Sequence, residues 1–174
     1  VIGLEVHCEL KSSSKNFSRS SNSFSQVPNS NVSVVDLGMP GILPVVNKEA
    51  VKNSIKMALA LNCEVPKYLT FERKNYFYPD LPKGYQITQM EKPVGVDGYV
   101  MINVNGENKK IGIHDIHLEE DTASMEHFSD YSLLDYNRAG VPLLETVTTP
   151  CIHSVDEAIA FLEALKGIFL YTWI

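Results

Sequence analysis

Closely spaced cysteines are absent from this sequence. Its three cysteines, Cys8, Cys63 and Cys151, lie far apart, are odd in number and form no C-x-x-C pair. This pattern supports neither a zinc cage nor a disulfide framework. The simplest expectation is therefore a protein of a reducing, intracellular compartment.

Long apolar runs and glycine-rich nucleotide motifs are missing too. No run approaches the roughly 20 apolar residues that a membrane-spanning helix needs, so we expect no membrane partner. Neither G-x-G-x-x-G nor G-x-x-x-x-G-K-[ST] occurs, which argues against Rossmann and P-loop sites. No signal peptide is visible. Because the sequence opens inside a strand-like run at Val1, without Met, we expect a fragment of a longer protein.

The sequence also lacks an excess of positive charge. Its 174 residues carry a formal net charge of −6, whereas a general polyanion binder is usually basic. A local basic patch would still allow selective contact with nucleic acid. The share of hydrophobic residues, 44%, and of charged residues, 21%, is that of a globular domain with one core.

Apolar and polar residues alternate in the first ten positions. Ile2, Leu4, Val6, Cys8 and Leu10 fall on one side of a predicted strand, which we expect to face a core. The other side carries three ionisable residues: Glu5, His7 and Glu9. An exposed strand face is the simpler explanation of these three, and a row of metal or proton ligands is the alternative.

Two helices are predicted. Apolar residues recur at helical spacing over 48–61, and Asn47 stands at the N-cap position. Ser154 and Glu157 have the spacing of a capping box, which predicts a second helix running to about Leu170. The Ser- and Asn-rich segment 12–33 is typical of a long loop.

Several strands are predicted, most of them antiparallel. Asn105-Gly106 suits the tight turn of a hairpin between strands at 98–104 and 109–118. The segment 71–90 has no clean period and is predicted to be an ordered loop with short strands at its ends, and 135–149 a loop followed by a strand. The fold class expected is α+β, with a mainly antiparallel sheet and flanking helices.

Two further acidic positions stand out. The stretch His117 to Asp121 places three carboxylates in a row, which is either a solvated turn or a Mg²⁺ site, because Mg²⁺ prefers oxygen ligands. Glu145 lies in an apolar strand, V-P-L-L-E-T-V, where a buried acid needs a partner. It is therefore either a surface position or a ligand turned into a pocket.

The segment from Arg73 to Gln89 combines basic, aromatic and amide side chains. Arg73, Lys74 and Lys83 are candidates for holding phosphates. The candidates for flanking or reading a base are Tyr76, Phe77, Tyr78, Tyr85, Gln86 and Gln89. An aromatic core with surface lysines explains the same composition more simply.

Five motifs together resemble one family. They are V-I-G-L-E-V-H from Val1, D-L-G-M-P-G-I-L-P-V-V-N-K from Asp36, R-K-N-Y-F-Y-P-D-L-P-K-G-Y-Q-I from Arg73, H-L-E-E-D from His117 and D-Y-N-R-A-G-V-P-L-L-E from Asp135. Their order and spacing are similar to those of the B subunit of glutamyl/aspartyl-tRNA(Gln/Asn) amidotransferase, over almost the whole chain.

The resemblance implies a fold similar to the glutamine synthetase and guanidino kinase group, and an ATP-dependent amidation. ATP would phosphorylate the side-chain carboxylate of Glu or Asp misacylated onto tRNA(Gln) or tRNA(Asn). Ammonia from a glutaminase subunit would then displace the phosphate, and Mg²⁺ would neutralise charge during phosphoryl transfer.

Site residues carried over by position fall into three sets. The resemblance implies a metal-binding set of His7, Glu120 and Glu145. Its implied catalytic set consists of Glu5, Glu119, Arg73, Lys74 and Lys83, where the two acids support the metal and the three cations contact phosphate or carboxylate. Its implied ATP-binding set consists of Tyr78, Tyr85 and Gln86.

The sequence departs from the family pattern in three places. Cysteines that hold zinc in many members are replaced here by Ser18, Ser20, Ser33 and Asp36, so we expect no zinc. The family's A-G-K after L-E-E-D is Thr122-Ala123-Ser124, and S-E-P-D-I-R is replaced by the residues from Thr148 to His153.

The resemblance also implies partners and a location. The expected partners are an amidase A subunit and a small C subunit in a heterotrimer, together with the misacylated tRNA. Residues 1–174 would form an incomplete amino-terminal cradle domain, without the carboxy-terminal helical and tail domains that grip tRNA. The expected location is the bacterial cytoplasm or an organellar matrix or stroma.

Two other functions compete with the ligase subunit. One is a truncated, non-catalytic product that at most binds the A subunit, and it need keep neither metal nor ATP binding. The other is a small-molecule amide ligase of glutamine synthetase type, which would use free glutamate. The choice between Glu-tRNA and Asp-tRNA is left open by the sequence.

Overall fold

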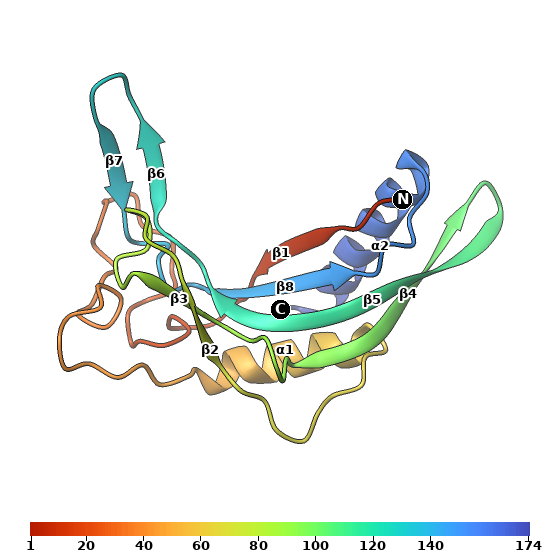
Figure 1. The fold of residues 1–174 in the computed structure, drawn as a ribbon, viewed down its shortest axis with the longest axis horizontal. Coiled ribbons are helices and arrows are strands. Elements are labelled where there is room, and N and C mark those ends of the chain that lie inside the picture. Colours follow the sequence, from red (N-terminus) through yellow and green to blue (C-terminus); the bar gives the residue numbers. More distant parts are fainter.

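The computed structural model describes residues 1–174 and has an α+β architecture (Figure 1). Its ten elements, in chain order, are β1 (Glu5–Glu9), α1 (Lys48–Ala60), β2 (Glu72–Asn75), β3 (Tyr85–Thr88), β4 (Gly95–Val104), β5 (Glu107–Glu120), β6 (Ser124–His127), β7 (Ser132–Asp135), β8 (Pro142–Thr148) and α2 (Val155–Thr172). The predicted fold class is confirmed.

A four-stranded antiparallel sheet organises the molecule, in the order β1-β8-β5-β4. Its two edges are β1 and β4, and β8 lies between β1 and β5 (Figure 1). The pairs β2–β3 and β6–β7 form separate two-stranded sheets. The register matters for function, because it places His7 of β1 opposite Glu145 of β8, and Glu145 opposite His117 of β5.

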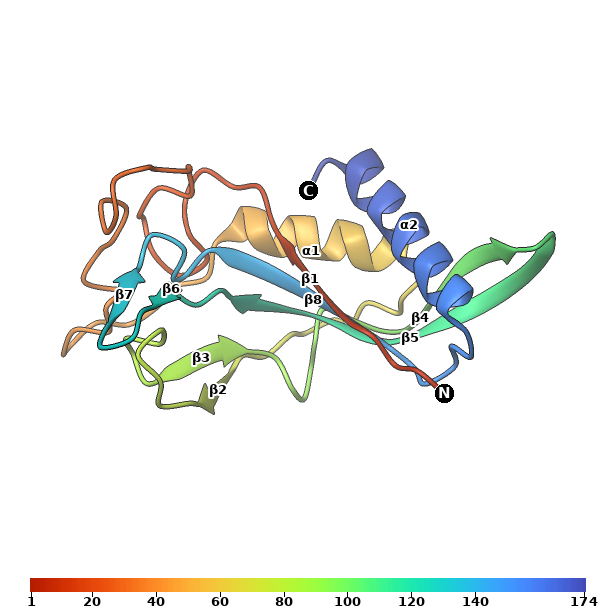
Figure 2. The ribbon, with the colours of Figure 1, turned by 90° about the horizontal axis from the view of Figure 1, so that it is seen from above.

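Both helices cover the same face of this sheet, while the β2–β3 pair lies on the other side (Figure 2). Between helices and sheet is a core of 18 buried residues, and the side chains of Met57 on α1 and Phe161 on α2 are fully buried in it. Ile2, Leu4 and Val6 pack against this core, so the predicted apolar side of the first strand is confirmed.

The helix caps agree with the sequence in part. Asn47 caps α1 by accepting hydrogen bonds from the backbone N–H groups of Glu49 and Ala50. Ser154 caps α2 by accepting one from Glu157, as predicted. The capping box is incomplete, however, because the Glu157 carboxylate accepts from the backbone N–H of His153 and pairs with Lys109 instead. The helix ends at Thr172, two residues beyond the predicted end.

The strands are longer and more numerous than predicted. The Asn105-Gly106 turn is confirmed, with φ angles of 53° and 86°, but its strands extend beyond the predicted 98–104 and 109–118. The β6–β7 hairpin was not predicted, because 124–135 shows no regular alternation. It is closed by the rings of Phe128 and Tyr131, which stack with centroids 4.8 Å apart.

Several apolar side chains of α2 are exposed. The exposed ones are Val155, Ile159, Leu162, Leu170, Tyr171 and, just beyond the helix, Trp173. Neither helix is long and apolar enough to cross a membrane.

Candidate functional site

Three strands of the main sheet bring three possible metal ligands together: His7 from β1, Glu119 from β5 and Glu145 from β8. Alternation along each strand turns these side chains to the sheet face opposite the core. His7 is more than a hundred residues away from the two acids in the sequence. The pairing of β1 with β8 and of β8 with β5 brings the three side chains together.

The ligand atoms of this triad lie within 4.8 Å of one another. The Nε2 atom of His7 is 3.1 Å from a carboxylate oxygen of Glu145 and 3.6 Å from one of Glu119. The His7 side chain is 56% exposed, whereas those of Glu119 and Glu145 are 4% and 14% exposed. The site is therefore open to solvent on the His7 side and closed beneath the two acids.

The two carboxylates of the triad differ in their electrostatics. Burial raises the pKa of Glu119, and the nearby charge of Glu145 raises it further. A hydrogen bond with His117 lowers the pKa of Glu145, although its partial burial opposes this effect. Thr88 donates a hydrogen bond of 3.3 Å to Glu119 from β3.

His117 is the partner of Glu145 on the next strand. Its Nε2 is 3.1 Å from Glu145, and its Nδ1 is 2.7 Å from Asp115. Burial lowers the pKa of His117, but the hydrogen bonds with Asp115 and Glu145 outweigh it and raise the pKa to about 9. The protonated imidazole of His117 therefore balances the charges of Asp115 and Glu145 at neutral pH.

The donor set of the triad fits a divalent cation. Two carboxylates supply the oxygen ligands that Mg²⁺ prefers, and the open side leaves room for the water and phosphate that usually complete its shell. A cation there would also offset the repulsion that raises the pKa of Glu119.

Glu120, placed in the metal set by the sequence, lies elsewhere. Because side chains alternate along β5, it points away from the triad and is buried against β3. Lys83 binds it with N–O distances of 2.5 and 2.7 Å, and the backbone N–H of Ile87 donates to it at 3.0 Å. The structure thus brings Glu119, and not Glu120, next to His7 and Glu145.

Four of the predicted phosphate- and ATP-binding residues form a second cluster around Glu120: Arg73, Lys83, Tyr85 and Gln86. The Tyr85 ring is flanked by two cations, with Arg73 4.4 Å and the Lys83 Nζ 5.3 Å from its centroid. Gln86 donates a hydrogen bond of 2.8 Å to the backbone carbonyl of Glu120. These side chains have partners within the protein.

Three other predicted residues are not brought into either cluster. Lys74 is exposed on β2, where it pairs with Gln86 across the hairpin. Tyr78 is 44% exposed and stacks against Tyr76 at 6.0 Å. Glu5 lies on the same face of β1 as His7 but outside the group of ligand atoms.

The sequence singled out His117 only as part of the acidic stretch 117–121, without a role of its own, and did not single out Asp115. The signal that would have found them is spacing, because residues 115, 117 and 119 of one strand share a face. A bulge between Ile113 and Asp115 shifts the register of β5 just before these residues, and a bulge cannot be read from the sequence.

Four residues stand where many family members were expected to carry zinc-binding cysteines: Ser18, Ser20, Ser33 and Asp36. They lie close together. Asp36 accepts hydrogen bonds from Ser20 Oγ at 2.5 Å and from Ser33 N at 2.8 Å. The fully buried Lys15 ammonium is 3.6 Å away. Burial raises the pKa of Asp36, but bonds from Ser20, Ser18 and Ser33 and the charge of Lys15 hold it below its usual value.

Comparisons with known proteins identify the family of the chain. The family model of the GatB/GatE catalytic domain matches residues 1–174. The chain is 56% identical to the B subunit of the aspartyl/glutamyl-tRNA(Asn/Gln) amidotransferase of Geobacillus thermodenitrificans and 57% identical to that of Listeria monocytogenes serotype 4b. Each match covers 99% of the chain and 36% of the relative's length.

The chain thus spans about a third of the curated relatives that it matches. The match covers every described element, and the family predicted from the five motifs is confirmed. The chain belongs to the GatB/GatE catalytic domain family, as a portion of the B subunit of a tRNA amidotransferase.

Proposed function

We propose that this chain carries the metal- and ATP-dependent site at which a tRNA-bound Glu or Asp is activated for amidation. The observation that carries the proposal is the meeting of His7, Glu119 and Glu145 from three strands, with ligand atoms within 4.8 Å. The names of its relatives, which are the B subunits of tRNA amidotransferases, support the substrate class.

The proposed chemistry follows from the poor reactivity of a carboxylate toward ammonia. The carboxylate of the tRNA-bound residue attacks the terminal phosphorus of ATP, and ADP leaves. Ammonia then attacks the acyl carbon, loses a proton, and expels inorganic phosphate to leave the amide. When bound, Mg²⁺ neutralises charge on the phosphoryl group.

The residues of the site have separate proposed roles. His7, Glu119 and Glu145 would hold the cation, while His117 orients Glu145 and Thr88 orients Glu119. Since Lys83 is already paired with Glu120, we propose that it fixes the β3 segment beside the site. Phosphate or carboxylate contacts then fall to the exposed Arg73 and Lys74, with Glu5 as a nearby acid.

The proposal also covers the partners of this chain, its location in the cell and its relation to other folds. The 36% of a relative's length that is matched leaves most of such a protein outside this chain. We propose that the whole subunit works with an amidase A subunit, a C subunit and the misacylated tRNA, in a bacterial cytoplasm or an organelle. A fold related to glutamine synthetase and guanidino kinases, with Tyr78, Tyr85 and Gln86 near ATP, belongs to the same proposal.

Calorimetric titration of the chain with Mg²⁺, ATP and both together tests the metal site. We expect His7→Ala, Glu119→Gln and Glu145→Gln each to weaken metal-dependent ATP binding at least about tenfold, since each removes a ligand. Glu107→Gln, an exposed acid at the tip of the β4–β5 hairpin, is the matched control and should bind as the wild type.

Two results would contradict the proposal. One is a folded wild-type chain that binds neither metal nor Mg·ATP, which would favour a non-catalytic fragment. The other is binding that survives all three substitutions. Comparison of Glu120→Gln with Glu119→Gln separates the two adjacent acids, because only Glu119 lies within the triad.

A further inference from the structure

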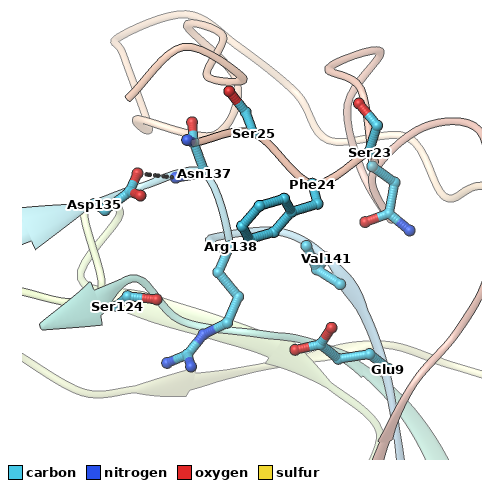
Figure 3. Close-up of a pocket in the computed structure, with 10 residues that line it drawn as sticks. Glu9, Ser23, Phe24, Ser25, Ser124, Asp135, Asn137, Arg138 and Val141 are labelled. Carbon is cyan, nitrogen blue, oxygen red and sulfur yellow. Dashed lines mark hydrogen bonds between the residues drawn. The ribbon is translucent and has the colours of Figure 1, made fainter. Parts of the chain in front are cut away.

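A cavity opens near the end of β1. Its volume is about 370 Å³, and it lies between the loop around Phe24, the first residue of β6 and the turn that enters β8 (Figure 3). The ten lining residues are Glu9, Asn22, Ser23, Phe24, Ser25, Ser124, Asp135, Asn137, Arg138 and Val141. A cavity of this size suits a small organic group.

This cavity adjoins the triad. Glu9, which lines it, follows His7 by two residues on β1, so both side chains point to the same face of the sheet. Two residues of an extended strand span about 7 Å. A ligand in the cavity would therefore extend directly toward the metal ligands.

An unpartnered aromatic ring stands over the cavity. Phe24 is 89% exposed, and Figure 3 shows its ring beside Val141 and Arg138. Phe24 and Val141 are the only hydrophobic residues of the lining. An apolar ring so exposed, beside a single apolar side chain, offers a stacking surface for one planar group.

The rest of the lining is polar and carries fixed hydrogen-bonding groups. The Nδ2 atom of Asn22 donates to Leu10 O and Ser12 Oγ, which leaves its Oδ1 free to accept. Arg138 donates to the carbonyl oxygens of Thr122 and Ala123 through Nε and Nη2, which leaves further N–H groups for the cavity.

Two carboxylates make the cavity unsuitable for a phosphate but suitable for hydroxyl groups. Glu9 and Asp135 both line it, and Asp135 uses one oxygen, Oδ1, to bind the backbone N–H groups of Asn29 and Asn137. Carboxylates accept hydrogen bonds from the hydroxyls of a ribose, as in dinucleotide sites. The chemistry combines a stacking ring, an acceptor for an amine and acceptors for hydroxyls.

We propose that this cavity binds an adenosine group, with its base stacked on Phe24, its amine on Asn22 and its ribose hydroxyls on Glu9 or Asp135. The inference rests on the proposed function, whose two large substrates, ATP and the 3′ end of aminoacyl-tRNA, both present adenosine. The phosphates, or the aminoacyl group, then extend out of the acidic cavity toward the triad.

Nucleoside titration without metal tests the proposal on the wild-type chain, followed by chemical-shift changes of the protein. We expect adenosine to bind and inosine, which replaces the amine with an oxygen, to bind about tenfold more weakly. Phe24→Ala should weaken adenosine binding between about fivefold and a hundredfold, because one stacking partner is lost. Tyr171→Ala removes an aromatic ring of similar exposure on α2 and should change nothing.

Competition identifies the source of the adenosine. Displacement by Mg·ATP assigns the cavity to the nucleotide and replaces the proposed ATP contacts of Tyr78, Tyr85 and Gln86, none of which lines the cavity. Displacement by an aminoacylated tRNA minihelix but not by Mg·ATP assigns it to the tRNA end. The proposal is overturned if adenosine does not bind, if Phe24→Ala binds like the wild type, or if neither substrate displaces it.

His7→Ala separates this proposal from the metal site. It should abolish metal-dependent binding and leave adenosine binding intact, since His7 does not line the cavity. A wild type that binds adenosine but no metal would defeat the proposed function, whereas metal binding without adenosine binding would defeat only this inference.

Discussion

At the scale of single residues, Glu119 and Glu120 are adjacent in sequence and opposite in environment. Glu119 belongs to the triad, which is open to solvent on the His7 side, while Glu120 is held by Lys83 in a pair whose side chains are each 5% exposed. Burial raises the pKa of Glu120, and Lys83 opposes this. A buried pair of this kind is costly to break from one side.

Lys83→Met and Glu120→Gln should each destabilise the chain, because each leaves one buried polar or charged partner unmatched. We expect a loss of about 3–5 kcal/mol for the lysine change, with a double variant that loses clearly less than the sum of the two. Urea denaturation measures both quantities. Lys109→Met, in a partly exposed pair with Glu157, is the control and should cost less than about 1 kcal/mol. Strict additivity would show that the Lys83–Glu120 pair is not coupled.

Because the pKa of Asp36 is lowered in the folded chain, the free energy of unfolding should depend on pH in the acid range. Its pKa is lowered in the folded state, so its contribution is present above the unfolded pKa of about 3.9 and is lost as the pH falls through the folded value. Asp36→Asn should therefore be less stable than the wild type at pH 7, and the difference should shrink below about pH 4. Urea unfolding at several pH values measures it. A difference independent of pH would mean that the charge of Asp36 contributes nothing.

The sequence predicted most residues of the candidate site, but it did not show which of the adjacent acids Glu119 and Glu120 lies in the triad. His7, Glu119 and Glu145 were all singled out from the sequence, and their metal-binding role stays a prediction. Selecting Glu119 over Glu120 needs the register between β5 and β8, which long-range pairing sets and local sequence does not.

At the scale of elements, we expect the same substitution to have opposite effects at two glycines, because their backbones differ. Gly106 has φ of 86° in the β4–β5 turn, and Gly167 lies within α2; neither has an atom within 4 Å of an added Cβ. Gly106→Ala should cost about 1 kcal/mol through backbone strain alone. Gly167→Ala should stabilise by roughly 0.5–1 kcal/mol, because alanine favours the helix. Thermal unfolding checks both, and equal effects would refute the backbone explanation.

The elements that the sequence predicted are those with a strong local signal. The 48–61 helix has a cap and a helical period, and Asn105-Gly106 suits one turn type, so both are confirmed. The β6–β7 hairpin has neither signal. Its strands are mostly exposed and are stabilised by pairing with each other and by the Phe128–Tyr131 stack, which only the folded chain brings together.

At the scale of the whole molecule, stability is expected to be uneven. The β8 strand is paired on both sides and largely buried, whereas the β6–β7 hairpin projects from the body with mostly exposed strands (Figure 1). Hydrogen exchange should be at least about tenfold faster for amides in β6 and β7 than in β8, because the hairpin opens without disturbing the core. Equal protection would mean that hairpin and sheet open as one unit.

The exposed apolar side chains of α2 have a practical consequence for handling the chain in solution. Mutual repulsion between molecules that each carry a net charge of −6 at pH 7 keeps these surfaces apart. Near the isoelectric point of about 5.3 that repulsion vanishes while the apolar side chains remain exposed. Light scattering should therefore rise as the pH approaches this value, and crystallisation or storage buffers are best kept well above it.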